Sequence, residues 1–296
     1  MNRVKKIILF LLFFLFLPWI LWAQDSATDA PEPWTQHLCG NVVSLSEYTG
    51  QALSSLALKR TILFDEHNRP QTEKGYGDGG ALKNKTSFAY NDAGLIAEIV
   101  GSGADGGFRW KYAYQYDEKN KLLRESSFDA QMQLEWYDIY RYNEEGILIE
   151  KVNYQADGSV NLQNSYQYDD QGRISLWLTL YSDGKLLKRV AFSYDQTGKV
   201  TKEERYNANG LYEQVQYSYN ETGQQTRATV SDPEGEMKET NTRLYDERGN
   251  LYRETVRNVE TKEESSTSYI YDPQGNWVRK REASGNYILR ELNYAR

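Results

Sequence analysis

The chain repeats a short motif, an aromatic residue followed by Asp or Asn, about every 26 residues. The motif occurs at Phe64-Asp65, Tyr90-Asn91, Tyr116-Asp117, Tyr142-Asn143, Tyr168-Asp169, Tyr194-Asp195, Tyr219-Asn220, Tyr245-Asp246 and Tyr271-Asp272. A fixed period of this length predicts one structural unit that is stacked many times, so that each unit packs mainly on its neighbours.

Each repeat divides into two halves, and each half reads as a strand followed by a tight turn. Residues 164–168 are typical of a strand, 169–172 of a turn and 173–181 of a second strand, after which Asp183-Gly184 turns the chain back. Glycine supplies the positive φ that such turns need, and an Asp or Asn at the turn start can accept hydrogen bonds from the backbone just after it. The sequence therefore predicts an all-β fold, an elongated, curved antiparallel sheet of about nine 26-residue hairpins in meander order.

The position two before each motif aromatic is large and apolar or aromatic in eight of nine repeats. The residues are Ile62, Phe88, Tyr114, Tyr140, Tyr166, Phe192, Tyr217, Arg243 and Tyr269. Because side chains alternate along a strand, we expect these rings on one buried, concave face. Arg243 breaks the column, which predicts a more polar region around residues 220–250.

The N-terminus has the order of a secretory signal peptide. Basic residues at positions 3, 5 and 6 precede the apolar run 7–22, and Ala23 precedes a polar stretch. We expect a signal peptide over 1–23, with an uncleaved anchor as the alternative. A flexible spacer is expected over 24–45 and the repeat domain over 46–296, with a short N-terminal cap near 51–58 covering the open end of the array. These features predict that the protein is exported by a bacterium and is periplasmic, located on the outer surface or secreted.

The net charge and the cysteine content limit the classes of partner that we expect for this chain. Without residues 1–23 the chain has 32 basic and 42 acidic residues, a net charge of −10. Such an acidic protein is a poor nonspecific binder of nucleic acid. Cys39 is the only cysteine, so it is expected either to be buried or to pair with another chain.

The segments Tyr114-Gln115-Tyr116-Asp117 and Phe192-Ser193-Tyr194-Asp195 resemble the RHS, or YD, repeats of bacterial exported proteins. The likeness covers roughly residues 60–290 and implies antiparallel hairpin strips that wind into shells. The half-repeats are also similar, more weakly, to MORN-type repeats, which are linked with interaction and scaffolding.

No cluster of residues in the sequence indicates a catalytic site or a metal-binding site. The histidines, His37 and His67, are far apart, and neither metal-ligand spacing nor a nucleophile elbow nor a phosphate loop is present. We expect no catalytic, cofactor-binding or metal-binding residues, and no enzyme activity. Turn chemistry accounts for the repeated Asp residues better than calcium does. Charges on both faces of 200–205 argue against a lipid-facing barrel.

Two sets of residues are candidates for facing a ligand. Trp110 and Trp136 lie one period apart and could form a platform, with ordinary packing as the alternative. Four cations share one repeat position, and the alternative for them is neutralisation by Glu203, Glu204 and Glu254. These cations are Lys202, Arg227, Arg253 and Arg279.

Together these features predict an exported, non-catalytic repeat protein that presents an extended β surface to a protein or glycan partner in the cell envelope. The rival hypothesis is a structural or spacer protein that self-associates through open sheet edges. A third, weaker hypothesis is a carbohydrate-active enzyme.

Overall fold

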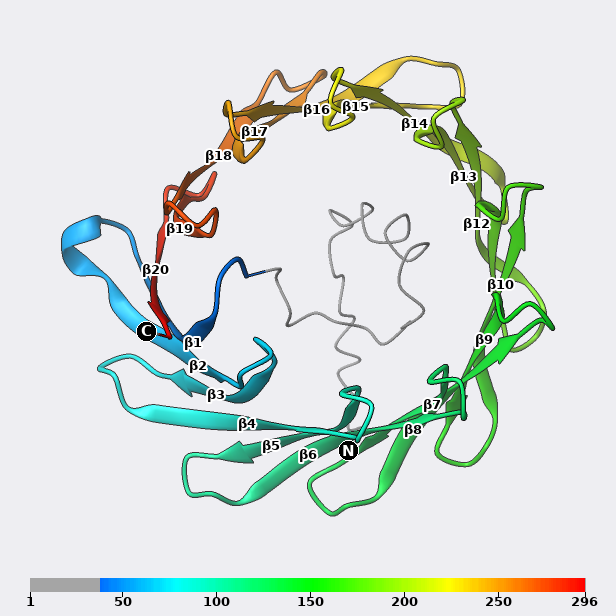
Figure 1. Ribbon diagram of the computed structural model, residues 1–296. Helices are drawn as coiled ribbons and strands as arrows, with labels where there is room; N and C mark the ends of the chain where they lie inside the picture. Colours follow the sequence, from blue (N-terminus) through cyan, green and yellow to red (C-terminus); the bar gives the residue numbers. More distant parts are fainter. Residues whose placement is uncertain (1–37, 296) are drawn as a thin grey trace, which may run out of the picture.

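Residues 38–295 are described by a computed structural model, in which twenty antiparallel strands form one closed ring (Figure 1). The expected signal peptide, most of the expected spacer and His37 lie outside these residues. The strands are β1 Val42–Gly50, β2 Ala57–Phe64, β3 Pro70–Tyr76, β4 Leu82–Tyr90, β5 Ile96–Gly103, β6 Phe108–Tyr116, β7 Leu122–Phe128, β8 Leu134–Tyr142, β9 Leu148–Gln155, β10 Val160–Tyr168, β11 Ile174–Tyr181, β12 Leu186–Tyr194, β13 Val200–Asn207, β14 Gly210–Tyr219, β15 Gln225–Ser231, β16 Met237–Tyr245, β17 Leu251–Asn258, β18 Glu264–Tyr271, β19 Trp277–Arg281 and β20 Tyr287–Tyr294.

The hairpin meander is confirmed, but the prediction of an open, elongated sheet is wrong. Successive strands pair in order, and β20 then pairs antiparallel with β1, with Leu45 opposite Leu292. Closure satisfies the backbone groups that two edge strands would leave unpaired. The expected N-terminal cap is therefore the tip of the β1–β2 hairpin, a 3-10 turn at Leu53–Ser55, and it covers no open end. Strand β1 begins at Val42, within the range expected to be spacer.

The motif tyrosines join neighbouring strands. Each hydroxyl donates to a backbone carbonyl near the start of the preceding strand, as when Tyr116 bonds to Ile96 at 2.8 Å. The same bond is made by Tyr90, Tyr142, Tyr168, Tyr194, Tyr219, Tyr245 and Tyr271. A hydrogen bond of this kind contributes on the order of 1 kcal/mol, so the motif stabilises the ring by repetition.

The motif Asp and Asn residues shape the turns, as predicted. Asp117 Oδ1 accepts hydrogen bonds from the backbone N–H groups of Lys119 and Lys121, both at 2.8 Å. The turn then closes through Asn120, which takes the left-handed conformation with φ of 63° where most repeats have glycine. One carboxylate oxygen is thus occupied by the backbone at each such turn.

The sheet has two distinct faces, because residues directly opposite on neighbouring strands point to the same side. The face that holds the predicted ring column is named the tyrosine face, and Phe88, Tyr140 and Phe192 on it are each less than 10% exposed. Burial of the ring column is therefore confirmed in part, because four of its eight apolar or aromatic members are buried and the other four are half-buried. The other side of the sheet is named the arginine face, after Arg227, Arg253, Arg257, Arg279 and Arg281.

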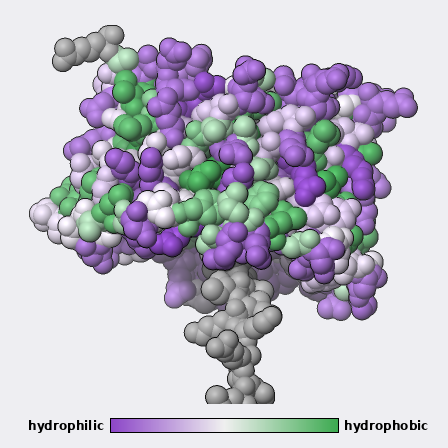
Figure 2. All heavy atoms as spheres, turned by 90° about the horizontal axis from the view of Figure 1, so that it is seen from below, coloured by the Kyte–Doolittle hydropathy of each residue, from purple (hydrophilic) through white to green (hydrophobic). Residues whose placement is uncertain are grey.

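The wall of the ring is a single layer. Strands contact mainly their two neighbours in the sheet, and the buried apolar residues form three separate small clusters. From the side, hydrophilic residues cover much of the wall and interrupt the apolar patches near its middle (Figure 2). Over residues 38–295 no helix has the length and apolar character needed to cross a membrane.

The seam between β20, β1 and β2 is held by charge rather than by the tyrosine ladder. Glu47 accepts hydrogen bonds from Arg290 at 3.1 Å and from Arg60 at 3.0 Å, and the Arg290 guanidinium lies 3.3 Å from the centre of the Trp277 ring. Burial lowers the pKa of Arg290 to about 10. Tyr294, on the closing strand, accepts a hydrogen bond from Asn276. The ring thus closes through backbone pairing and an apolar cluster, to which these polar side-chain contacts are added.

Candidate binding surfaces

A continuous strip of aromatic rings lies on the tyrosine face of β6 and β8. The Tyr112 ring centre is 5.2 Å from that of Trp110 and 5.9 Å from that of Trp136. Between Tyr112 and Trp136 stands Ser127, which is opposite both and 3% exposed. Because Ser127 is small, rings from two alternate strands can meet above it. These three rings, each half-buried, are named the aromatic strip.

Trp110 reaches the strip because its cross-strand partner is a glycine. Gly101 lies opposite Trp110, and a Cβ atom on Gly101 would stand 2.1 Å from Cε2 of the indole. One side of the indole therefore lies against the β5 backbone. This close approach explains a glycine inside a strand, where it otherwise weakens the sheet.

A groove of about 220 Å³ adjoins Trp110. Its polar lining comes from Asn84, Thr86 and Ser102, and its charged lining from lysines on β4 and an arginine on β6. The full set is Lys83, Asn84, Lys85, Thr86, Gly101, Ser102, Gly103, Arg109 and Trp110. Ring surface beside amide and hydroxyl groups is an arrangement that suits a ligand with both apolar and hydroxylated sides.

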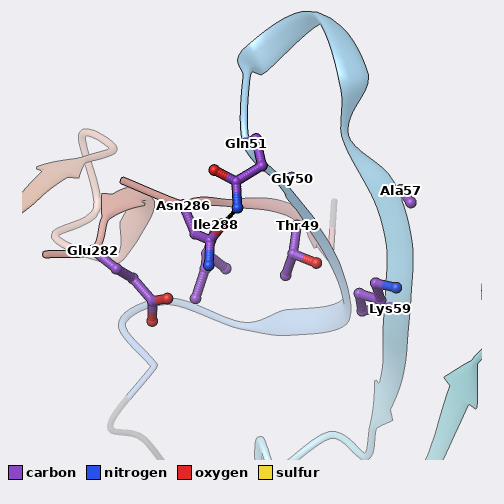
Figure 3. Close-up of a pocket in the computed structure, with 8 residues that line it drawn as sticks. All are labelled: Thr49, Gly50, Gln51, Ala57, Lys59, Glu282, Asn286 and Ile288. Atoms are coloured by element: carbon purple, nitrogen blue, oxygen red, sulfur yellow. Dashed lines mark hydrogen bonds between the residues drawn. The ribbon is translucent and has the colours of Figure 1, made fainter. Parts of the chain in front are cut away.

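A second pocket, of about 350 Å³, lies where the β1–β2 tip meets the β19–β20 turn (Figure 3). Gln51 and Asn286 point toward each other and share a hydrogen bond of 2.5 Å. Lys59 and Glu282 also line it, but each already has an ion pair, with Asp78 at 2.8 Å and with Lys280 at 3.0 Å. With no ring in its lining, this pocket is a weaker candidate than the strip.

Next to the strip, Glu125 and Asp138 are buried directly opposite each other. Tyr140 donates to Glu125 at 3.2 Å, while Asp138 pairs with Lys151 at 2.7 Å and accepts from Asn153. Burial raises the pKa of the Glu125 carboxyl, and nearby Asp138 adds to this, against the lowering effect of Lys151. No sequence motif marks this pair, because Glu125 and Asp138 meet through the register between β7 and β8.

On β12–β14 the tyrosine face carries a second charged network. Glu203 is 1% exposed, bonds to Arg205 at 2.9 Å and accepts from Tyr217 at 2.6 Å. Arg205 also reaches Glu213 at 2.6 Å. Burial raises the pKa of Tyr217, and the neighbouring Glu203 carboxylate raises it further.

The four sequence-predicted cations lie on the arginine face, and their expected neutralisation is largely wrong. Lys202 pairs with Glu204 at 2.7 Å. Glu203, as shown above, and Glu254 instead lie on the tyrosine face, where Glu254 bonds to Arg243 at 2.9 Å. Within residues 38–295, no ion pair joins an acid to the other three cations. These are Arg227, Arg253 and Arg279.

Two further expectations concern reactive and metal-binding groups. Burial of Cys39 is wrong, because the free thiol is exposed while its backbone N–H and carbonyl bond to Asn276. In the described part of the chain, no three His, Cys, Asp or Glu side chains gather as a metal site would require.

A family model described as "Uncharacterised protein" matches residues 63–193, and no curated protein matches the chain. The likeness to RHS or YD repeats and to MORN-type repeats stays a prediction.

Among solved structures, the chain is similar to the Tc holotoxin pore of Photorhabdus luminescens, at 12% identity and a TM-score of 0.34, over 77% of this chain and 16% of that one. It is also similar to a porin-like protein from Bacteroides uniformis, at 9% identity and a TM-score of 0.39, over 86% of this chain and 98% of that one. A porin-like protein from Bacteroides vulgatus matches at 12% identity and a TM-score of 0.31, over 66% of this chain and 94% of that one. The chain thus spans about 16% of the length of the Photorhabdus chain.

Proposed function

We propose that this protein is an exported, non-catalytic glycan-binding protein of the bacterial envelope, with the aromatic strip as its binding platform. The observation that carries the proposal is the contact of Trp110, Tyr112 and Trp136 in one half-exposed row, with centre-to-centre spacings of 5.2 and 5.9 Å. Each spacing is close to the length of one pyranose ring in an extended chain.

The chemistry of the strip and its groove suits a saccharide. The apolar C–H side of a sugar ring stacks on an aromatic face, and its hydroxyl groups need donors and acceptors at the edge of the stack. Asn84 and Thr86, on the same face as Trp110, supply such groups at the Trp110 end. A protein partner would more often be met by a larger, continuous apolar patch with a polar rim. We therefore favour a glycan over a protein as the ligand.

A carbohydrate-active enzyme is the second candidate, and one observation favours it. Glu125 and Asp138 face each other beside the strip, and a pair of carboxyl groups is the machinery of glycoside hydrolysis. Both are less than 10% exposed, however, and both are held by neighbouring side chains. A substrate would have to displace those contacts, so binding without cleavage is the better-supported function.

A glycan array tests the proposal. The wild-type chain should bind a subset of polysaccharides, and Trp136→Ala should remove that binding while leaving the circular dichroism spectrum unchanged. Trp177→Ala is the matched control, because Trp177 lies on the same face but bonds to Asn164 away from the strip. Absence of array binding by the wild-type chain, or full binding by Trp136→Ala, would overturn the proposal. Release of new reducing ends from a bound glycan would favour the enzyme instead.

A further inference from the structure

The arginine face of β15, β17 and β19 concentrates positive charge in a protein that is acidic overall, with a formal net charge of −7. Five arginines stand on this face, one on β15 and two each on β17 and β19. They are Arg227, Arg253, Arg257, Arg279 and Arg281. All but Arg279, which is half-buried, are exposed.

The acids that could neutralise this charge are mostly directed to the other face. Glu254 and Glu239 lie on the tyrosine face, the first paired with Arg243. On the arginine face itself, Glu264 stands opposite Arg257, and the other paired positions of β15–β18 carry mainly hydroxyl side chains. These are Thr229, Thr240, Thr242, Thr255, Ser266 and Ser268. The face therefore offers charge and hydroxyl donors together.

Two of the arginines flank one small residue. Ser268 on β18 is directly opposite Arg253 on β17 and directly opposite Arg281 on β19. Two strand spacings separate the arginines, about 9–10 Å between backbones. Their long side chains can converge on a group held above Ser268, whose hydroxyl lies between them. Arg281 is also within 5.6 Å of the Tyr287 ring centre, which supports its guanidinium on one side.

We infer that this face binds a linear anionic polysaccharide, with Arg253 and Arg281 holding one of its acidic groups above Ser268. A guanidinium presents a planar fork of N–H donors that matches a carboxylate or sulfate in a bidentate manner. The separation of alternate strands is comparable to the length of a disaccharide, so a polymer with an acidic group on every sugar or on every second sugar can present one such group to each arginine-bearing strand. This site is on the opposite face from the aromatic strip and does not depend on it.

The hydroxyl groups favour a saccharide over other polyanions. Ser and Thr side chains can bond to sugar hydroxyls between the acidic groups, whereas a duplex nucleic acid is held mainly through its phosphates. An anionic glycan is therefore the single ligand class to which we commit.

Calorimetric titration with polygalacturonate, and with neutral dextran as the uncharged probe, tests the inference. The wild-type chain should bind polygalacturonate and not dextran at this site. The double variant Arg253→Ala/Arg281→Ala should raise Kd at least about tenfold, a loss of about 1.4 kcal/mol. Arg248→Ala removes the same charge from an exposed turn outside these rows and should change Kd less than about twofold.

A double variant with conservative substitutions separates the effect of guanidinium geometry from the effect of positive charge. Arg253→Lys/Arg281→Lys keeps both positive charges but removes both forks, so binding should fall between the wild-type and alanine values. The inference is overturned if polygalacturonate does not bind, or if Arg248→Ala weakens binding as much as the double variant. It is also overturned if anionic phospholipid vesicles or duplex DNA bind the same arginines more tightly than polygalacturonate.

Discussion

Two stretches of the tyrosine face, β6–β8 and β12–β14, occupy equivalent repeat positions and are filled differently. Both contain a buried glutamate that accepts a tyrosine hydroxyl, Glu125 from Tyr140 in the first and Glu203 from Tyr217 in the second. The next row reads Tyr112, Ser127 and Trp136 in the first stretch. In the second it reads Val190, Arg205 and Glu213.

The difference separates structural from functional positions. On β12–β14 the charged side chains pair with one another, because Arg205 binds both Glu203 and Glu213. On β6–β8 the same row offers two half-exposed rings, Tyr112 and Trp136, and Trp110 in the neighbouring row extends them into the aromatic strip. The repeat therefore supplies the buried Glu–Tyr bond in both places, and the adjoining row is free to serve a ligand in one of them.

The largest expected loss of stability is in β12–β14, where the charged side chains pair with one another. Arg205→Ala leaves Glu203 buried without its cation and should lower the free energy of unfolding by about 3–5 kcal/mol. Urea unfolding followed by circular dichroism measures this. As a control, Lys202→Ala breaks a half-exposed pair with Glu204 and should cost less than about 1 kcal/mol. Equal losses in the two variants would contradict the description of Glu203 as a buried charge that depends on Arg205.

The second prediction addresses the aromatic strip. Gly101→Ala places a methyl group against the Trp110 indole, so the ring must move and the strip is disrupted. Overpacking of this kind costs about 1–3 kcal/mol, and binding to glycans should weaken as well. The control is Gly77→Ala, whose added methyl group meets no atom closer than 3.9 Å. Unchanged glycan binding by Gly101→Ala would show that the position of Trp110 does not matter.

A smaller effect is expected for the tyrosine ladder that both stretches share. Tyr116→Phe removes the hydroxyl bond to Ile96, and Tyr194→Phe removes the equivalent bond to Ile174. Each should cost about 0.5–1.5 kcal/mol in urea unfolding, because one hydrogen bond is lost at each site. A much larger loss at only one of the two sites would mean that the ladder is not equivalent around the ring.

The smallest expected effect is a pH dependence at Glu125. Burial raises the pKa of this carboxyl from its ordinary value of 4.5, so the folded chain holds the proton more tightly than the unfolded chain. Its contribution to stability is therefore greatest at low pH and falls as pH rises through the ordinary value toward the folded pKa. Glu125→Gln should flatten this part of the stability profile, measured by thermal unfolding over a pH series. An unchanged profile would assign the pH dependence to other groups.

Much of the architecture could be predicted from the sequence because it is local. The Asp and Asn turns, the hairpin order and the buried ring column each follow from residues within one repeat, such as Asp117 with Lys119 and Lys121. Ring closure could not be predicted in this way. It depends on Leu45 meeting Leu292 and on Glu47 meeting Arg290, contacts between the two ends of the described chain.

The candidate site was predictable only in part. The spacing of Trp110 and Trp136 placed both rings on one face, but Tyr112 joins them only because Ser127 is small and lies between. Glu254 directly follows Arg253, and Glu203 directly follows Lys202, so alternation along the strand directs each acid to the face opposite its neighbouring cation. The expected neutralisation of the cations considered closeness in sequence and not this alternation, whereas the contact of Tyr112 with Trp136 depends on strand register.

The most direct test of the central claim is hydrogen–deuterium exchange with and without a glycan identified on the array. Ligand bound to the aromatic strip should slow exchange of backbone amides in β5–β8 and leave those in β12–β14 unchanged. Slower exchange confined to β12–β14, or the same change in both stretches, would contradict the assignment of ligand binding to the strip.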